Sequence, residues 1–282
     1  MKSQPPYIKK RRETFHRQLT ELPAFRALLR AVEADFYQEL PISRPILDLG
    51  CGDGHFAQAT FRSALDFGLD PWPHCLREAR PREAHRWLVH AEGAQIPCAS
   101  GSFGTVISNS VLEHIPDVDP VLAEVSRVLA PGGYFHFSVP GPNFRRFLSV
   151  ARGLDAAGLQ ALAERYRRLF DRISRHHYYL GPEAWTRKLA QVGLQVDRWW
   201  SYFSPGALAA LEWGHPLGLP SVLAKRIAGR WVLVPTRWNL WLTERLLRRF
   251  YEEPLIAEDP ETAGEPSAVS GAYLFFSVQK LQ

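Results

Sequence analysis

The chain has 282 residues, 46% apolar and 22% charged, which is the composition of an ordinary globular protein that can bury a sizeable core. Its three cysteines, Cys51, Cys75 and Cys98, show no CxxC spacing or paired histidine motif, so we predict neither a disulfide framework nor a metal site. The N-terminus lacks the apolar run of a secretory signal, and no stretch of about 18 uncharged apolar residues predicts a membrane-spanning helix. We therefore expect a cytoplasmic protein.

The formal net charge of +5 comes largely from two basic clusters, Lys9 to Arg12 and Arg245 to Arg249. Such clusters favour an anionic partner, either nucleic acid or a membrane surface, or they form a solvated basic face. No RNP motif or GXXG clamp is present, which disfavours nucleic acid. The sequence does not define an oligomeric state.

The first predicted elements are one or two helices between Phe15 and Leu40, interrupted at Pro23. Apolar residues recur there at spacings of three and four, as on one face of a helix. From residue 45 the pattern changes to short apolar runs alternating with helical stretches. Strands are predicted at 46–49, 64–70, 87–90, 104–108 and 134–139, with helices from about 54, at 75–84 and at 119–129. This alternation predicts an α/β protein with a doubly wound parallel sheet.

A longer helical insertion is predicted after the fifth strand, at 143–175, with Leu159, Leu162, Tyr166 and Leu169 on one face. A further helix should begin at Pro182 and stop at Gly193. Strands 194–202 and 272–281 would complete a seven-stranded sheet. Between them lies an excursion that ends in a polar loop, 258–267. We predict three parts: a helical cap, 1–44; a catalytic domain, 45–203 plus 271–282; and an aromatic and basic insertion, 204–270.

The most informative segment is the strand 46–49 and the glycine-rich turn that follows it. Gly50, Gly52 and Gly54 would let the backbone turn tightly and approach a ligand at the carboxyl end of a strand. A dinucleotide loop needs its third glycine at position 55, which is His55 here. Asp48 and Asp53 bracket the turn, and carboxylates oppose a pyrophosphate but suit a cationic amino group. The loop favours a cationic nucleoside cofactor over a dinucleotide.

Asp70 ends the second predicted strand, about twenty residues beyond the loop. A carboxylate in that position can accept hydrogen bonds from both ribose hydroxyls of a nucleoside. The alternative is a surface aspartate preceding a turn-forming proline.

These segments resemble a known family. Asp48–Gly54 resembles motif I of class I S-adenosylmethionine-dependent methyltransferases, and Gly68–Pro71 resembles their motif II. The stretches 91–97, 108–115 and 127–134 resemble, in order, the adenine-contacting segment, the strand and turn beside the active site, and the motif before the fifth strand. Gly104 departs from the family, where aspartate is frequent. Within that family the segments resemble methyltransferase domains of type 11 or 25. The resemblance implies a Rossmann-like fold and S-adenosyl-L-methionine as cofactor.

The resemblance also implies roles for particular residues. Asp48 and the loop residues Gly50, Cys51 and Gly52 would hold the methionine part of the cofactor, and Asp70 the ribose. Glu92, in place of the more usual aspartate, and Gly93 would contact the adenine. Asn109 would line the cofactor near the sulfonium.

Methyl transfer from a sulfonium needs alignment and a nucleophile without its proton. Candidates for the base are His114, in the active-site turn, and His176 and His177 after the helical insertion. Many relatives carry Glu-His in this turn, so His114 has an alternative role in orienting it.

The excursion is the most distinctive part of the chain. Six of the nine tryptophans lie between Trp199 and Trp241, interleaved with basic residues and followed by an amphipathic stretch, 241–251. This pattern fits an interfacial membrane anchor across 204–251, which implies a lipid-like acceptor and peripheral membrane location. It fits equally a cap over the pocket of a soluble small-molecule acceptor. Non-catalytic nucleoside binding and an NAD-dependent oxidoreductase are the other functions considered.

Overall fold

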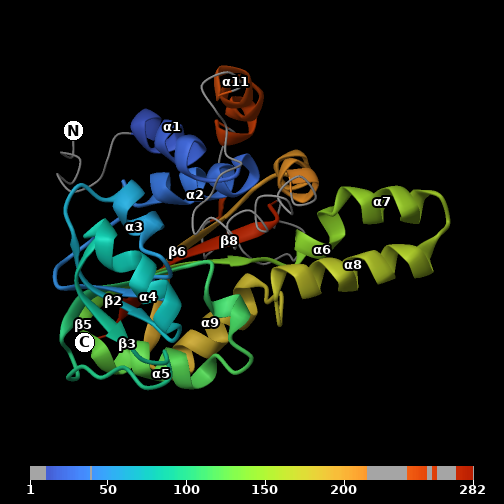
Figure 1. The fold of residues 1–282 in the computed structure, drawn as a ribbon. Helices are drawn as coiled ribbons and strands as arrows, with labels where there is room; N and C mark the ends of the chain where they lie inside the picture. Colours follow the sequence, from blue (N-terminus) through green and yellow to red (C-terminus); the bar gives the residue numbers. More distant parts are fainter. Residues whose placement is uncertain (1–10, 39, 215–239, 253–255, 259–270, 282) are drawn as a thin grey trace.

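The computed structural model describes residues 11–38, 40–214, 240–252, 256–258 and 271–281 (Figure 1). The strands are β1 (Ile46–Leu49), β2 (Leu65–Asp70), β3 (His85–His90), β4 (Phe103–Asn109), β5 (Leu129–Pro140), β6 (Leu194–Tyr202), β7 (Ile256–Glu258) and β8 (Tyr273–Lys280). The helices are α1 (Arg11–Glu21), α2 (Ala24–Phe36), α3 (His55–Thr60), α4 (Pro73–Ala79), α5 (Asp119–Val128), α6 (Asn143–Phe147), α7 (Ser149–Ala156), α8 (Gln160–Ser174), α9 (Pro182–Gln191) and α11 (Leu240–Tyr251). Short 3₁₀ turns, η1 (Arg80–Arg82) and η2 (Leu112–His114), follow α4 and β4, and residues 205–214 are also helical.

All described strands join one sheet, in the order β3-β2-β1-β4-β5-β8-β6-β7. The first five run parallel, and β8 lies antiparallel between β5 and β6. The seven predicted strands are all present, which confirms the α/β prediction. The short β7, paired antiparallel with β6, is an eighth strand that the sequence analysis did not predict. The polar loop 258–267 lies outside the described residues, except for Glu258.

Two apolar clusters cover the two faces of the sheet. One includes residues of α1, α2, α3 and α8, and the other includes residues of α5 and α9. Neighbouring residues of β8 alternate between the clusters: Phe275 belongs to the first and Phe276 to the second. Figure 1 shows α1, α2 and α11 on one side of the sheet, α5 and α9 on the other, and α7 and α8 extending away from the body. The sheet is therefore doubly wound, as predicted.

The helical insertion differs from the expectation in detail. It consists of three helices, α6, α7 and α8, and Gly158, with φ of 76°, lies in the turn between α7 and α8. The predicted apolar face was wrong for the leucines, because Leu162 and Leu169 are each 48% exposed. Ala163 and Phe170 are buried instead. Their spacing of seven is also helical, so the sequence is compatible with either apolar face. The face that is buried is the one whose Phe170 contacts Phe144 of α6.

Some other boundaries moved. β5 begins at Leu129, five residues before the predicted start, and α4 ends at Ala79, where η1 replaces the expected last turn. Gly104, the departure from the family pattern, has a local reason. A Cβ atom at this position would lie 2.8 Å from the carbonyl oxygen of Ser43, so the chain preceding β1 leaves no room for a side chain.

Among the described residues, no helix combines the length and apolar character needed to cross a bilayer.

His136 is a fully buried histidine in the middle of β5. Its Nε2 lies 2.8 Å from the carbonyl oxygen of Pro41 and donates a hydrogen bond to it, which ties the chain after α2 to the sheet. Burial lowers the pKa of His136 from 6.5 to about 4. The imidazole is therefore neutral in the folded protein at pH 5, whereas an unfolded histidine is largely protonated there.

This difference predicts an acid-sensitive contribution to stability. The contribution is present above pH 6.5 and is lost as the pH falls toward 4, amounting to about 2 kcal/mol between pH 7 and pH 5. His136→Phe should cost about 1 kcal/mol at pH 7, because Pro41 loses its donor, and should lower the pH dependence by that 2 kcal/mol. Urea unfolding at both pH values measures this. His90→Phe, at an exposed histidine that also contacts a proline carbonyl, should retain the wild-type slope. If His136→Phe lost as much unfolding free energy between pH 7 and pH 5 as the wild type does, His136 would not be the source of the pH dependence.

Candidate active site

The glycine loop follows β1 and crosses the end of β2. Gly50, Gly52 and Gly54 all have positive φ, at 78°, 55° and 71°, which side chains disfavour. A Cβ on Gly50 would lie 2.5 Å from Cγ1 of Val111, so this position also needs the missing side chain. The backbone N–H groups of Gly50 and Cys51 both donate to the carbonyl oxygen of Leu69. The loop is thus fixed at the carboxyl edge of the sheet.

Asp70, at the end of β2, holds the same loop from below. Its Oδ2 accepts a hydrogen bond from the N–H of Gly52 at 2.9 Å, and its Oδ1 accepts one from the N–H of Trp72 at 2.9 Å. Burial raises the pKa of Asp70, and these two backbone donors oppose that shift. The carboxylate has a fixed position beside the loop.

Asp48 has a partner that the sequence analysis missed. It lies on β1, is 4% exposed, and its Oδ2 accepts a hydrogen bond from Nε2 of His85 at 2.9 Å. His85 begins β3, two strands away in the sheet. Its ring lies against Gly68 on the intervening strand, where a Cβ would be 2.8 Å from Cδ2 of His85. The absence of a side chain at Gly68 makes this contact possible.

His55, where a dinucleotide loop would have its third glycine, has a structural role. The side chain is buried, and its Nε2 pairs with Oε2 of Glu21 on α1 at 2.9 Å. This contact lowers the pKa of Glu21 to about 2. His55 therefore joins the first N-terminal helix to the helix that begins at the glycine loop.

The predicted adenine segment lies next to the loop strand. Glu92, directly after β3, is exposed, and Gly93 packs so that an added Cβ would be 3.3 Å from Cδ1 of Leu49. The segment therefore reaches the end of β1.

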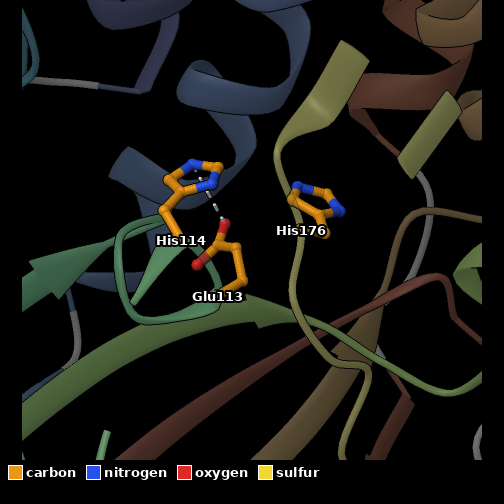
Figure 2. Close-up of side chains that lie close together, drawn as sticks. All are labelled: Glu113, His114 and His176. Atoms are coloured by element: carbon orange, nitrogen blue, oxygen red, sulfur yellow. Dashed lines mark ion pairs between the residues drawn. The ribbon is translucent and has the colours of Figure 1, made fainter. Parts of the chain in front are cut away.

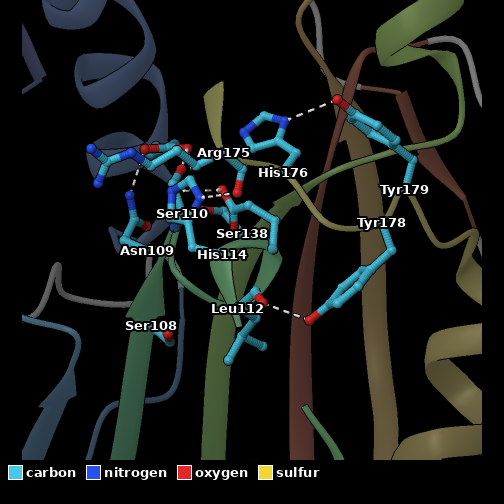
Figure 3. Close-up of polar contacts among 12 residues, drawn as sticks. Ser108, Asn109, Ser110, Leu112, His114, Ser138, Arg175, His176, Tyr178 and Tyr179 are labelled. Atoms are coloured by element: carbon cyan, nitrogen blue, oxygen red, sulfur yellow. Dashed lines mark hydrogen bonds and ion pairs between the residues drawn. The ribbon is translucent and has the colours of Figure 1, made fainter. Parts of the chain in front are cut away.

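Asn109 ends β4, and α2 engages its side chain. Nδ2 donates to Oε2 of Glu33, and Oδ1 accepts a hydrogen bond from the hydroxyl of Tyr37 at 3.3 Å. The carbonyl oxygen of Asn109 accepts a further hydrogen bond from Nη1 of Arg30 at 3.0 Å. The end of β4 is thus held by the N-terminal helices, and Figure 3 shows Asn109 and Ser110 together at that end.

Glu33 is the most connected group that the sequence analysis missed. It is 0% exposed, and its Oε1 accepts hydrogen bonds from three hydroxyls, those of Ser110, Ser138 and Tyr202. Arg30 pairs with Oε2 at 3.0 Å. One signal was present in the sequence, because Glu33 stands between Leu29 and Phe36 on the apolar stripe of α2. A charged residue in such a stripe indicates a buried polar network.

The structure brings two of the three candidate histidines together. The rings of His114, in η2, and His176, after α8, have centroids 5.5 Å apart. Burial lowers the pKa of His114, which favours its neutral form. His177 is exposed, and its backbone N–H donates to the carbonyl oxygen of Glu113 at 2.9 Å. That backbone contact places the chain after α8 against η2.

Glu113 lies beside the paired histidines and was not among the predicted site residues. It is 1% exposed, and its Oε1 is 4.0 Å from Nε2 of His114. Burial raises the pKa of Glu113 to about 8. The Glu-His dipeptide therefore presents one buried acid and one neutral imidazole to the same space.

Comparison with known proteins agrees with this geometry. Residues 47–137 match the model of a methyltransferase domain. An uncharacterized methyltransferase of Mycobacterium sp. strain JLS is 28% identical over 194 residues, covering 66% of this chain and 73% of the relative. Another, of Mycobacterium tuberculosis strain H37Rv, is 28% identical over 227 residues, covering 78% of each chain.

Two solved structures share the fold. An S-adenosylmethionine-dependent methyltransferase of Thermotoga maritima superposes with a TM-score of 0.52 at 15% identity, covering 95% of this chain and 91% of the other. Geranyl diphosphate C-methyltransferase of Streptomyces coelicolor gives a TM-score of 0.53 at 15% identity, covering 91% and 78%. The match over 47–137 thus shows a methyltransferase domain in this chain, and the two solved structures show that it has the fold of S-adenosylmethionine-dependent methyltransferases.

Proposed function

We propose that the protein transfers a methyl group from S-adenosyl-L-methionine to a small-molecule or lipid-like acceptor. The observation that carries this proposal is the glycine loop closed by Asp70 at the carboxyl edge of the sheet. Open α/β sheets bind their ligands at that edge. The Streptomyces coelicolor structure holds S-adenosyl-L-homocysteine, which supports the same cofactor class here.

The loop fits the cofactor in shape and charge. A Cβ on Gly52 would meet no atom within 4 Å, so open space lies over the middle of the loop. Asp70 offers a fixed carboxylate beside that space, which suits the two hydroxyls of a ribose. The carboxylate of Asp48 adds negative charge below the loop, which suits a cationic amino acid moiety better than a pyrophosphate.

We assign the individual contacts accordingly. The methionine part would be held by Asp48, Gly50, Cys51 and Gly52, the ribose by Asp70, and the adenine by Glu92 and Gly93. Asn109 would line the cofactor from the end of β4, with its side chain held by Glu33 and Tyr37.

When bound, the cofactor supplies an electrophilic methyl group and a neutral thioether leaving group. The chain must then align the acceptor and remove its proton. We propose that His114 and His176 face the acceptor, because they share one space at the end of β4. His177 is exposed and would serve through its backbone alone.

Each of the three predicted parts of the chain has a role in the proposed function. Residues 1–44 would form a cap that belongs to the site, because Glu33 reaches three strand ends from α2. Residues 45–203 with 271–282 would form the catalytic domain. Residues 204–270 would form the insertion that contacts acceptor or membrane.

For the described part of that insertion we propose a membrane contact in preference to a pocket cap. α11 packs on α1 through Tyr251, whose ring stacks on Phe15 at 4.2 Å. Its opposite face exposes Trp241 by 67% and Leu246 by 59%. Three arginines of the same helix are also exposed, at 245, 248 and 249. Apolar and basic side chains together suit the surface of an anionic bilayer.

Cofactor binding tests the assigned contacts. Wild-type protein should bind S-adenosyl-L-methionine and S-adenosyl-L-homocysteine with micromolar dissociation constants, about −8 kcal/mol, and should not bind NAD. Asp70→Ala should weaken binding about 100-fold, because it removes the hydroxyl acceptor and releases Gly52. Isothermal titration calorimetry measures both.

Asp117→Ala is a matched control, because it removes an exposed aspartate and changes the net charge equally. It should leave cofactor affinity unchanged. Unchanged affinity in Asp70→Ala would refute the ribose assignment, and binding of NAD alone would refute the proposed reaction.

Vesicle binding tests the proposed membrane contact of α11. The protein should sediment with vesicles of phosphatidylglycerol and stay in solution with phosphatidylcholine. Changing Arg245, Arg248 and Arg249 to glutamine should weaken vesicle binding about 100-fold, at about 1 kcal/mol for each arginine.

The control changes three exposed arginines of α8 to glutamine, at 165, 168 and 172. This variant has the same net charge as the α11 variant and should retain vesicle binding. Loss of binding in the α8 variant alone would place the contact on α8 and overturn the proposal for α11.

A further inference from the structure

We infer that Glu113, His114 and His176 form a binding site for a divalent transition-metal ion. One potential ligand atom from each residue lies within 4.8 Å of the others. Glu113 and His114 come from η2, whereas His176 follows α8, more than 60 residues later in the sequence. Figure 2 shows one carboxyl oxygen of Glu113 directed toward the imidazole of His114, with the imidazole of His176 on the neighbouring segment.

The first support is the state of the Glu113 carboxyl group. The side chain is buried, and Oε2 has no hydrogen-bond partner among the residues that the structure describes. A buried carboxyl oxygen without a donor costs free energy, so such atoms in proteins are normally paired. Oε1 is the oxygen that faces His114, so a cation bound by both carboxyl oxygens would supply the missing partner of Oε2.

The second support is the orientation of His114. Its Nδ1 lies 3.1 Å from the carbonyl oxygen of Arg175, to which it donates a hydrogen bond. This contact selects the tautomer whose lone pair is at Nε2. That Nε2 is the atom closest to the carboxyl group of Glu113, at 4.0 Å. Metal-binding histidines commonly donate their other ring N–H to a backbone carbonyl in this way.

His176 is oriented by a similar relay. The hydroxyl of Tyr179 donates to Oδ1 of Asp171 at 2.6 Å, so its oxygen can accept a hydrogen bond from Nδ1 of His176 at 3.3 Å. This arrangement, visible in Figure 3, again places a lone pair at Nε2. The carboxylate of Asp171 behind the accepting hydroxyl makes the imidazole a more basic ligand. Both histidines are thus arranged as metal ligands by contacts outside the cluster.

The ligand set selects the kind of ion. Two imidazoles and one carboxylate suit zinc, iron, cobalt or manganese, whereas magnesium and calcium prefer oxygen ligands. Ligands bonded at about 2.1 Å around zinc lie about 3.4 Å apart, so the side chains would close slightly on the ion. Three protein ligands leave a coordination position open, which is the arrangement of catalytic metal sites.

The inference rests on the proposed function in one respect, the use of the open position. An acceptor hydroxyl or thiol bound there would release its proton to solvent water more readily, because the ion stabilises the anion. The two imidazoles would then bind metal, and the ion would take over the task of activating the acceptor. Binding of the metal itself does not depend on the cofactor.

The test is a titration of the full-length protein, without a histidine tag, with Co²⁺ and no cofactor. We expect one equivalent to bind, with visible absorbance bands of a site containing nitrogen ligands, and Zn²⁺ to displace it while a large excess of Mg²⁺ does not. Glu113→Gln and His176→Gln should weaken binding about 100-fold or more, and Tyr179→Phe about 10-fold, since it removes only the relay. His177→Gln, the neighbouring exposed histidine, should bind as the wild type does.

Co²⁺ binding that survives both ligand substitutions would overturn the inference, because it would place the ion elsewhere. Absence of a Co²⁺ spectrum in protein that binds S-adenosyl-L-methionine would also overturn it and would leave the proposed function intact. A Co²⁺ spectrum that depends on these ligands, in protein that fails to bind the cofactor, would support the metal site and refute the proposed reaction.

Discussion

The buried carboxylate of Glu33 determines how the N-terminal helices meet the sheet. It accepts hydrogen bonds from Arg30 on its own helix and from Asn109, Ser110, Ser138 and Tyr202 at the ends of three strands. A carboxyl group away from water is tolerated only when its polar atoms are hydrogen-bonded. Helix α2 can therefore occupy one position above the sheet, and that position closes the edge where the glycine loop lies.

This constraint couples two regions that would otherwise be separate. Asn109 ends the strand next to β1, and Ser110 leads into η2, which carries Glu113 and His114. Because both residues bond to Glu33, α2 sets the direction in which the chain leaves β4. The segment that carries His176 is then placed by the backbone contact between His177 and Glu113. Helix α2 thus positions η2, and η2 in turn positions the segment that carries His176 on the acceptor side of the proposed site.

The parts of the structure that sequence could predict are those determined by local patterns. Strand 194–202 was predicted at its observed bounds, because the helix and the glycine that precede it are nearby in the chain. The glycine loop followed from the spacing of Gly50, Gly52 and Gly54. The contacts of Glu33 were out of reach, since its partners lie up to 169 residues away. The same holds for Glu113 and His176, which only the packing of α8 brings together, and for β7, which is three residues long.

The place of β8 in the sheet has a consequence for how the chain folds. β5 and β6 each pair with β8 and not with each other. During synthesis β6 is made about 70 residues before β8, so it cannot join the sheet until β8 has been made. Until then β5, with the apolar side chains of Phe135 and Phe137, is an unpaired edge of the kind that associates with other chains. The synthesis of β8 therefore sets the time at which this edge is covered.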